Sequence, residues 1–594
     1  MNMKKTILTI ILLFSSILIF AQRPVWMWAR QAGGNNIDFG NSIAVDSQNN
    51  IYVTGSYYGN ATFGDVTFTN GDNWNLFIGK LDSNGNWLWI REAGSIVQEE
   101  GFDIKIDNDG NCYVIGTFER TVEFGTITLI SKGQRDIFVT KLDSNGNWIW
   151  ATSCGGDTGL PYLSDSAGHI YLDDARNIYI TGYFYKNATF GNINLISYGY
   201  ANNNTIDSDI FVAKLDNDGN WLWAKSAGGK SHDTSRPLLT VDNYGNCYIS
   251  GKFNDIIYFN NSFGDNLFLS PQGYINSNIY IAKLSQNGNW LWAKSIWGDD
   301  LCDSRYLFID LQSNLYLTGN FKGKIYFYPN QYNQSDSLTA LQPGTNDIYF
   351  AKYNSSGVLV NAKRGNFSST TLSSTKMDSK GYYYLTGYFS GTATFGNTTL
   401  TSVGQSDLFI AKLDNNANCL WVKSANGSIV SYKHDIDSKG DCYIIGYFNN
   451  TATFGSQTLI TPSSYQDIFI AKAHIPYYIN NVPVFEESNN ATVTVSGGDA
   501  DKGSLDNFPP IPNQNANYKK FNIILHSSIS QWIVEIQSDD IYGAYYLHNK
   551  WNVVYGNKGR IVFQIILNPT KGDVPIPIIL GNEKTHTKSH YKFK

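Results

Sequence analysis

The chain has 594 residues, of which 16 % are charged and 15 % aromatic, and its formal net charge is −6 at pH 7. This length is too great for one ordinary hydrophobic core, so we expect several domains or a repeat array. Abundant glycine and asparagine, without long helical periodicity, predict many short strands joined by tight turns. A nucleic-acid-binding protein normally has a clustered basic face, and the lack of any basic run argues against that class.

The N-terminus has the three parts of a secretory signal. Lys4 and Lys5 precede an apolar run over residues 7–20, and the small residue Ala21 follows. We therefore predict a signal peptide over residues 1–21. The alternative is an N-terminal membrane anchor, but the run is shorter than the ~20 apolar residues that span a bilayer. The protein is expected to be secreted, outside the cell or on its outer surface, with the periplasm as an alternative. No transmembrane segment is expected after signal cleavage.

One segment, Ile51–Gly55, recurs seven times along the chain. The glycines of the copies are Gly55, Gly116, Gly182, Gly251, Gly319, Gly387 and Gly446. Nine residues before each glycine stands an aspartate: Asp46, Asp107, Asp173, Asp242, Asp310, Asp378 and Asp437. Further along, each copy has a strand-like segment with a lysine: Lys80, Lys141, Lys214, Lys283, Lys352, Lys412 and Lys472. Self-similarity at a regular spacing is the sequence signature of a repeat architecture.

Each copy is expected to contain four main strands and one extra hairpin. In the first copy the strands are predicted at residues 42–46, 51–55, 77–81 and 87–89, with the small hairpin over residues 61–68. The connecting segments contain Asn, Gly and Asp, which tolerate positive φ or bond to turn amides. The repeat therefore predicts four-stranded antiparallel blades.

The two ends of the repeat array indicate how it closes. The segment Trp26–Trp28 matches Trp87–Trp89, yet it precedes the first complete copy, and the seventh copy ends near Lys472 without a fourth strand. The N-terminal strand should therefore complete the last blade, which would protect exposed sheet edges. The predicted fold is all-β, a seven-bladed β-propeller over residues 22–475 closed by the N-terminal strand.

The repeat resembles the bacterial SBBP family of seven-bladed propeller repeats. The motif is carried by segments such as 44–46 with 50–55, and 209–215, and the resemblance covers about residues 25–473. One departure is the fifth copy, where Leu359 and Asn361 replace the tryptophan pair. The resemblance implies a secreted repeat scaffold and supplies no catalytic motif.

The repeat stops after His474, and residues 476–594 are predicted to form a small β-sandwich-like C-terminal domain. Its strand-like runs cover residues 491–495, 521–525, 532–536, 561–567 and 574–580.

The repeated polar residues have both structural and functional interpretations. The aspartates could form a metal-binding ring, but each stands where a strand meets a tight turn, which favours capping of turn amides. The segments 107–111 and 216–220 resemble calcium loops only faintly, since neither has the distal Glu. The lysines could bind an anion, but a structural role beside carboxylates of the blades is favoured. The tryptophan pairs could stack on a sugar, but packing between blades is favoured. We therefore assign no catalytic residue, metal ligand or cofactor.

The longest loops belong to the third, fourth and fifth copies, over residues 192–209, 260–278 and 328–347. They are predicted to meet on one rim and to bind a ligand through Tyr198, Tyr200, Tyr274, Tyr328 and Tyr332, although neutral loop drift would give the same lengths. The first functional hypothesis is a secreted or cell-surface, non-catalytic scaffold that binds an extracellular glycan or protein. The alternative is a secreted polysaccharide-cleaving hydrolase or lyase, which would require titratable residues converging near the channel mouth. The oligomeric state is not indicated.

Overall fold

The structure, a computed structural model, divides into two compact units, Val25–His474 and a second unit that contains residues 475–594. In the first unit it describes residues 24–94, 97–156, 159–160, 163–203, 207–230, 236–259, 267–272, 278–327, 336–342, 344–378 and 380–474; beyond these it describes the strands of the second unit.

Each of the seven sequence repeats corresponds to four consecutive antiparallel strands, here called a blade. Blade 1 contains β2 (Asp38–Val45), β3 (Ile51–Phe63), β4 (Val66–Leu81) and β5 (Trp87–Ala93). Blade 2 contains β6 (Glu99–Ile106), β7 (Cys112–Phe124), β8 (Ile127–Leu142) and β9 (Trp148–Gly155). Blade 3 contains β10 (Ser166–Leu172), β11 (Ile178–Tyr185), β14 (Ser208–Leu215) and β15 (Trp221–Gly228). Blade 4 contains β16 (Leu238–Val241), β17 (Cys247–Lys252), β20 (Asn278–Leu284) and β21 (Trp290–Gly298).

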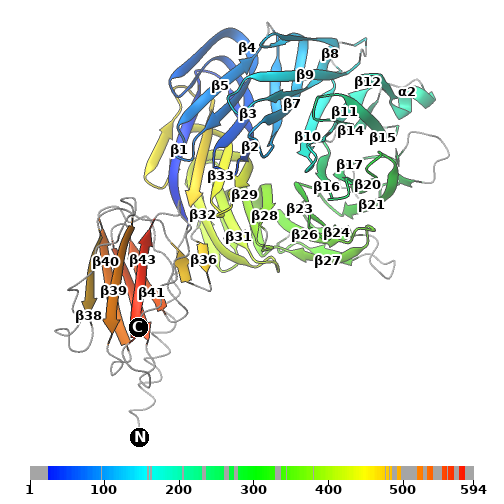
Figure 1. Ribbon diagram of the computed structural model, residues 1–594. Coiled ribbons are helices and arrows are strands. Elements are labelled where there is room, and N and C mark those ends of the chain that lie inside the picture. Colours follow the sequence, from blue (N-terminus) through cyan, green and yellow to red (C-terminus); the bar gives the residue numbers. More distant parts are fainter. Residues whose placement is uncertain are drawn as a thin grey trace. The chain divides into compact units, whose positions relative to one another are not determined.

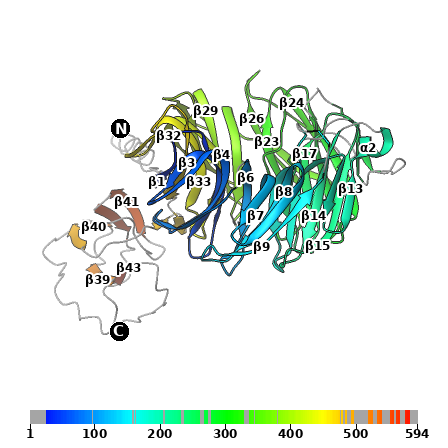
Figure 2. The same cartoon turned by 90° about the horizontal axis from the view of Figure 1, so that it is seen from above.

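The remaining blades follow the same order. Blade 5 contains β22 (Tyr306–Ile309), β23 (Leu315–Phe321), β26 (Asp347–Tyr353) and β27 (Leu359–Arg364). Blade 6 contains β28 (Phe367–Met377), β29 (Tyr383–Phe395), β31 (Asp407–Leu413) and the first part of β32 (Cys419–Ile436). Blade 7 contains the second part of β32, β33 (Cys442–Phe454), β35 (Gln466–His474) and β1 (Val25–Gly34). Figure 1 shows the blades arranged around a common axis, and in Figure 2 their strands run along that axis.

The N-terminal strand pairs with the end of the repeat array, as the sequence predicts. Strand β1 lies antiparallel to β35, with Trp28 opposite Lys472 and Gln31 opposite Phe469. The side chain of Gln31 also donates a hydrogen bond of 2.5 Å to Asp467, which lies 436 residues away in the chain. The outermost strand of blade 7 thus comes from the other end of the propeller sequence.

The extra hairpin between the second and third strands is also present, but it lies on the neighbouring blade. The hairpin of β18 (Ile257–Phe259) and β19 (Phe268–Leu269) in blade 4 pairs with β15 of blade 3. The other junctions use the ends of the long strands or the short strands β12 (Asn187–Phe190), β13 (Ile193–Ile196), β24 (Lys324–Phe327), β25 (Asp336–Thr339), β30 (Thr398–Thr401) and β34 (Gln457–Ile460). Each hairpin pairs with the last residues of the outermost strand of the preceding blade and so shortens an edge whose unpaired backbone groups invite association with another chain.

The repeated aspartates cap tight turns, as predicted. In blade 4 the Oδ1 atom of Asp242 accepts hydrogen bonds from the backbone nitrogens of Tyr244 and Asn246 at 3.0 and 2.9 Å. Its Oδ2 atom accepts a hydrogen bond from Tyr248 at 3.2 Å, and the Lys283 ammonium lies 4.7 Å from the centre of that tyrosine ring. The same Asp–turn contact recurs in all seven blades. The repeated lysines stack over the corresponding tyrosine rings in every blade.

The two tryptophans of each pair have different roles. The second one reaches the next blade: the indole nitrogen of Trp89 donates a 3.0 Å hydrogen bond to the carbonyl oxygen of Ser144, in a turn of blade 2. The same contact is made by Trp28, Trp150, Trp223 and Trp292. The first tryptophan instead packs within its own blade, as Trp87 does edge-on against Phe63 at 5.6 Å. It also contacts the apolar clusters between neighbouring blades, as Trp87 and Trp290 do. Packing between blades is therefore observed for both positions, with the hydrogen bond to the next blade made by the second.

The hydrophobic core is divided among the interfaces between neighbouring blades. One cluster, for example, joins Tyr113 and Ile115 of blade 2 to Ile178 and Phe211 of blade 3, all of them buried. Cys112, Cys247 and Cys442 are buried in these layers as small hydrophobic residues, and all six cysteines are free thiols.

The second unit is also built from antiparallel strands. A four-stranded sheet has the order β38 (Ala491–Ser496), β40 (Gln531–Ser538), β42 (Arg560–Ile566) and β41 (Trp551–Asn557). Two further pairs are β39 (Tyr518–Leu525) with β43 (Val574–Gly581), and β36 (Tyr477–Ile479) with β37 (Val482–Val484). The five predicted strand-like runs correspond to β38, β39, β40, β42 and β43, whereas β36, β37 and β41 were not predicted.

Replacing Trp28 with alanine tests the contact that joins the last blade to the first. Trp28 is 7 % exposed, so its removal should lower the free energy of unfolding by about 3–5 kcal/mol. Leu88→Ala, at a 53 % exposed position of an equivalent strand, should change it by less than about 0.5 kcal/mol. Thermal and denaturant unfolding measure both, and equal effects would contradict the role of the indole contact.

Replacing Asp242 with alanine should destabilise blade 4 by about 0.5–2 kcal/mol, the scale of a lost capping bond. The matched control is Asp65→Ala, at an exposed hairpin tip, and it should have no measurable effect. If Asp242→Ala instead released a bound ion without changing the unfolding curve, a metal-binding role would replace the structural one.

Candidate functional site

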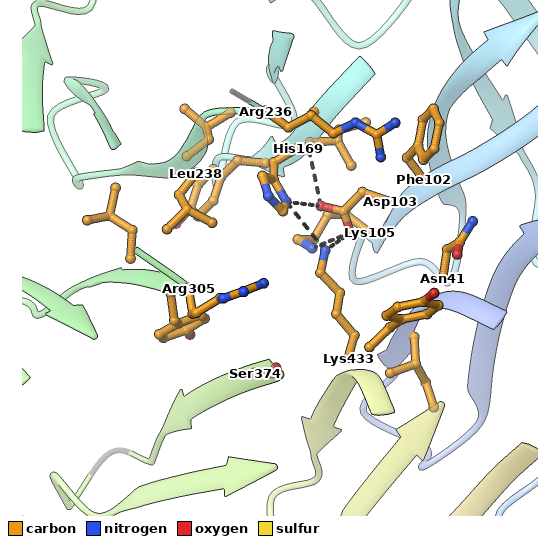
Figure 3. Close-up of a pocket in the computed structure, with 18 of the residues that line it drawn as sticks. Asn41, Phe102, Asp103, Lys105, His169, Arg236, Leu238, Arg305, Ser374 and Lys433 are labelled. Atoms are coloured by element: carbon orange, nitrogen blue, oxygen red, sulfur yellow. Dashed lines mark hydrogen bonds and ion pairs between the residues drawn. The ribbon is translucent and has the colours of Figure 1, made fainter. Parts of the chain in front are cut away.

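The innermost strands of the blades surround a central cavity of about 950 Å³. Side chains from β2, β6, β10, β16, β22, β28 and β32 line it, and Figure 3 shows several of them converging on one space. This volume lies at the upper end of the range for small-ligand sites. The cavity is therefore the strongest candidate site among the described residues.

One position of the repeat forms a ring inside this cavity. The fourth residue before each turn aspartate is Ser42, Asp103, His169, Leu238, Tyr306, Ser374 or Lys433. All of them except Ser42 line the cavity. The innermost strands of the blades run in the same direction and have the same register. These seven residues, although far apart in sequence, therefore lie at the same height along the channel.

Asp103 is the centre of a hydrogen-bonded network that joins four blades. Its side chain is 2 % exposed, and its Oδ1 atom lies 2.6 Å from Lys433 Nζ and 3.3 Å from Lys105 Nζ. Ser42 donates a 2.8 Å hydrogen bond to the same oxygen. The Oδ2 atom lies 3.2 Å from Nδ1 of His169, which is itself 3.5 Å from Lys433 Nζ (Figure 3).

The network shifts the ionisation of its members. Burial favours the neutral form of Asp103, but the ammonium groups of Lys105 and Lys433 and the hydrogen bond with His169 hold its pKa well below the usual range. Burial, together with nearby Lys105 and Lys376, lowers the pKa of Lys433 to about 8 despite the attraction of Asp103. Burial and Lys433 also lower the pKa of His169. At neutral pH the network therefore contains one carboxylate and two ammonium groups.

Arginines stand at one mouth of the cavity, on the N-terminal side of the ring. Arg236 lies over the Phe102 ring, with its guanidinium carbon 4.0 Å from the ring centre. Among the described residues it has no carboxylate within ion-pair distance, and it is exposed. Arg305 is paired with Asp303 at 2.8 Å, but its side chain remains 44 % exposed. This mouth thus presents positive charge to solvent.

Aromatic rings share the same mouth. Phe39 and Trp74 are stacked with their centres 5.7 Å apart and an angle of 2° between their planes. Tyr432, 37 % exposed, packs against both Phe39 and Tyr447. The mouth combines flat apolar faces with cationic groups, a combination suited to binding a ligand that has both an apolar face and negative charge.

The arrangement provides limited means for hydrolysis. Of the cavity-lining residues, only Glu100 and Asp103 have carboxyl groups. Asp103 is a poor proton donor because its pKa is strongly lowered, and Glu100 accepts a hydrogen bond from Gln98. Within the described part of the chain, no three His, Cys, Asp or Glu side chains are grouped closely enough to hold a metal ion.

The same described residues include no helix with the length and apolarity needed to cross a membrane.

Of the five tyrosines predicted from sequence to bind a ligand, the structure describes two, Tyr198 and Tyr200. Tyr198 and Tyr200 lie on the short helix α2 (Tyr198–Asn203). Tyr198 is only 1 % exposed, because its ring stacks on Tyr258 with centres 4.6 Å apart and its backbone nitrogen is bound to Asp209. It is therefore not presented to a ligand in this structure. Tyr200 is 38 % exposed, whereas Tyr274, Tyr328 and Tyr332 lie outside the described residues, so binding by the rim loops stays a prediction.

The sequence analysis did not identify the cavity residues, although a signal for them exists. Aligned on the turn aspartates, most copies have Ser, Asp, His or Lys at the ring position, whereas the next position is apolar in five copies. Alternation of this kind shows which side chains face the channel. Which of them would touch depends on the spacing of blades around the axis, which the repeat motif does not encode.

Comparison with known proteins agrees with the repeat. Residues 28–59 match the family model described as SBBP, a beta-propeller repeat. An uncharacterized WD repeat-containing protein of Acanthamoeba polyphaga mimivirus is 24 % identical to it, over 75 % of this chain and 38 % of the relative. The match thus spans well under half of that relative's length.

Solved structures with similar arrangements are distant. YCF48 from Cyanidioschyzon merolae has 10 % identity and a TM-score of 0.34, over 75 % of this chain and 98 % of that one. The quinohemoprotein alcohol dehydrogenase from Comamonas testosteroni has 9 % identity and a TM-score of 0.32, over 76 % of this chain and 78 % of that one. At this distance no activity or ligand transfers to this protein.

Asp103→Asn tests the electrostatics of the network. Loss of the carboxylate removes the attraction that favours the Lys433 ammonium, so the pKa of Lys433 should fall below its value of about 8. The variant should also unfold more easily, by about 1–3 kcal/mol, because two partly buried ammonium groups lose their partner. Side-chain NMR titration of labelled lysines measures the first effect. Asp218→Asn, in an exposed turn, is the control, and an unchanged Lys433 titration in Asp103→Asn would refute the coupling.

Proposed function

We propose that this chain is a secreted or cell-surface scaffold, a seven-bladed propeller closed by its N-terminal strand, which binds an extracellular glycan or protein without transforming it. The ligand enters the central cavity through the mouth that carries Phe102, Arg236 and Tyr432. The blades hold this site on rigid strands, so that the ligand meets a preformed surface.

The observation that carries the proposal is the composition of this mouth. The exposed ring of Tyr432, the stacked pair of Phe39 and Trp74, and Arg236, which has no ion pair among the described residues, stand together above a cavity of about 950 Å³. Phe39 also packs against Tyr432 and Tyr447 of the neighbouring blade, so the aromatic groups are held in place by the fold. Apolar and cationic groups gathered at a concave opening are typical of a binding site.

One observation supports a second candidate, a polysaccharide-cleaving enzyme of the lyase type. Lys433 has its pKa lowered to about 8 and lies 3.5 Å from His169 inside the cavity. A lysine of this kind can abstract a proton near neutral pH. The ammonium is, however, paired with Asp103 at 2.6 Å, which favours its charged form over the free base.

A glycan array with the mature chain, residues 22–594, tests the proposal. We expect one group of glycans to bind and Tyr432→Ala to weaken that binding by about tenfold, as the loss of 1–2 kcal/mol of ring contact implies. The control is Tyr244→Ala, a 73 % exposed tyrosine in a turn away from the cavity.

The same array separates the two candidates. Mass spectrometry of the glycans after incubation should show unchanged chains if the protein only binds them. Shortened chains with a new unsaturated end would establish the lyase instead. If neither glycans nor candidate extracellular proteins bind in a Tyr432-dependent manner, the proposed site is wrong.

A further inference from the structure

Positive charge in the cavity exceeds negative charge. Five Lys or Arg side chains line it but only two carboxylates, in a chain whose net charge is −6. Lys376 is paired with Asp435 at 3.1 Å and Arg305 with Asp303 at 2.8 Å, so these pairs are close to neutral. The excess comes from two other places.

The first place is the Asp103 network. One carboxylate there faces the ammonium groups of both Lys433 and Lys105, which leaves one positive charge uncompensated. The second is Arg236, whose guanidinium lies over the face of Phe102 and has no ion pair among the described residues. The Glu100 carboxylate attracts Arg236, but Glu100 also lies 3.9 Å from Arg135, so positive charge still exceeds negative charge here. Both places lie on the inner face of the cavity, and in Figure 3 Arg236 and Lys433 extend into the same space. A bound anion would supply the missing negative charge.

We propose that the cavity binds an acidic sugar residue, one whose ring carries a carboxylate or a sulfate, with Arg236 and Lys433 contacting the anionic group. This inference rests on the proposed function and specifies the ligand of the same site. Arginine suits the role because its planar guanidinium can hold two oxygens of a carboxylate or sulfate at once.

The surroundings favour a sugar over an acidic peptide. The stacked pair of Phe39 and Trp74 and the exposed ring of Tyr432 present flat apolar faces at the mouth, and the C–H face of a sugar ring packs on such a face. Asn41 and Ser374, which also line the cavity, can exchange hydrogen bonds with hydroxyl groups. An extended acidic peptide would pair with a strand edge, and β10, β16 and β22 are edge strands of their sheets, so hexaglutamate serves as the peptide probe in the test below.

The site also predicts how binding depends on pH. Lys433 loses its charge as the pH rises through about 8, because burial and neighbouring cations lower its pKa. Affinity for an anionic sugar should therefore be greatest below pH 8 and should decline above it. Binding of the anion should in turn raise the pKa of Lys433, since opposite charge favours the ammonium form.

Calorimetric titration of the mature chain with defined oligosaccharides tests the inference. The probes are trigalacturonate, its fully methyl-esterified form, a sulfated disaccharide and hexaglutamate. We expect trigalacturonate or the sulfated sugar to bind at least about tenfold more tightly than the ester, on the scale of one charged hydrogen bond. Comparison of the two acidic sugars identifies which anionic group the site prefers.

Arg236→Gln should abolish this preference, because it removes charge from an exposed side chain without disturbing a described ion pair. Binding of the ester should be unchanged. The control is Arg120→Gln, an exposed arginine outside the cavity lining, which should bind all probes as the unmodified protein does. Lys433→Met is the second variant, and thermal unfolding of each variant shows whether the fold is kept.

Three results would overturn the inference. Equal binding of the ester and the acid, unaffected by Arg236→Gln but still weakened by Tyr432→Ala, would leave the proposed glycan site in place and exclude recognition of charge. Tighter binding of hexaglutamate than of any sugar would assign the cavity to an acidic peptide. Absence of binding by every probe, together with a negative glycan array, would reject both the inference and the function on which it rests.

Discussion

The structure depends on the contact between the outermost strand of one blade and a turn of the next. The indole of Trp89 reaches the carbonyl oxygen of Ser144 and covers Gly146, where φ is +80° and a Cβ atom would stand 2.8 Å from the ring. Five blade junctions repeat this contact. Glycine is needed in this turn for two reasons, its backbone conformation and the space for the tryptophan. Each blade therefore fixes the position of its neighbour through a side chain that is far from the channel.

The extra hairpins strengthen the same junctions between blades, but each one reaches back to the preceding blade in the chain. The tryptophan contact joins a blade to the one that follows, whereas the hairpin of a blade pairs with the outer edge of the one that precedes it. The apolar clusters lie between these two contacts and contain residues from both blades. A single blade can therefore bury little of its apolar surface alone, and stability is shared among neighbours. With packing confined to these layers, the side chains that face the channel are free to vary.

Structural features that recur in every repeat could be predicted from the sequence. Features formed by residues that differ from one repeat to the next could not. The cap at Asp242 and the pairing of β1 with β35 follow from residues that recur in register, and both are observed. The ring network was missed because Asp103, His169 and Lys433 come from different copies, and only the three-dimensional arrangement brings them together. Tyr198 is the opposite case, a residue that was predicted to contact a ligand. Its position in a long loop suggested that its side chain is exposed to solvent, whereas stacking on Tyr258 buries it.

The distribution of polar residues around the ring argues that the cavity is more than a consequence of the fold. At the position where blade 4 has Leu238, blade 2 has Asp103 and blade 7 has Lys433. Leu238 shows that an apolar residue is accepted there, and apolar packing commonly stabilises a core as well as a buried ion pair does. Stability alone thus gives no reason to keep a buried carboxylate with two ammonium groups around it. At this position the charged residues Asp103, His169 and Lys433 belong to blades 2, 3 and 7, and Leu238 and Tyr306 to blades 4 and 5, so the two sides of the ring differ in polarity. A ligand with an anionic group and a flat apolar face would be held in one orientation by that asymmetry.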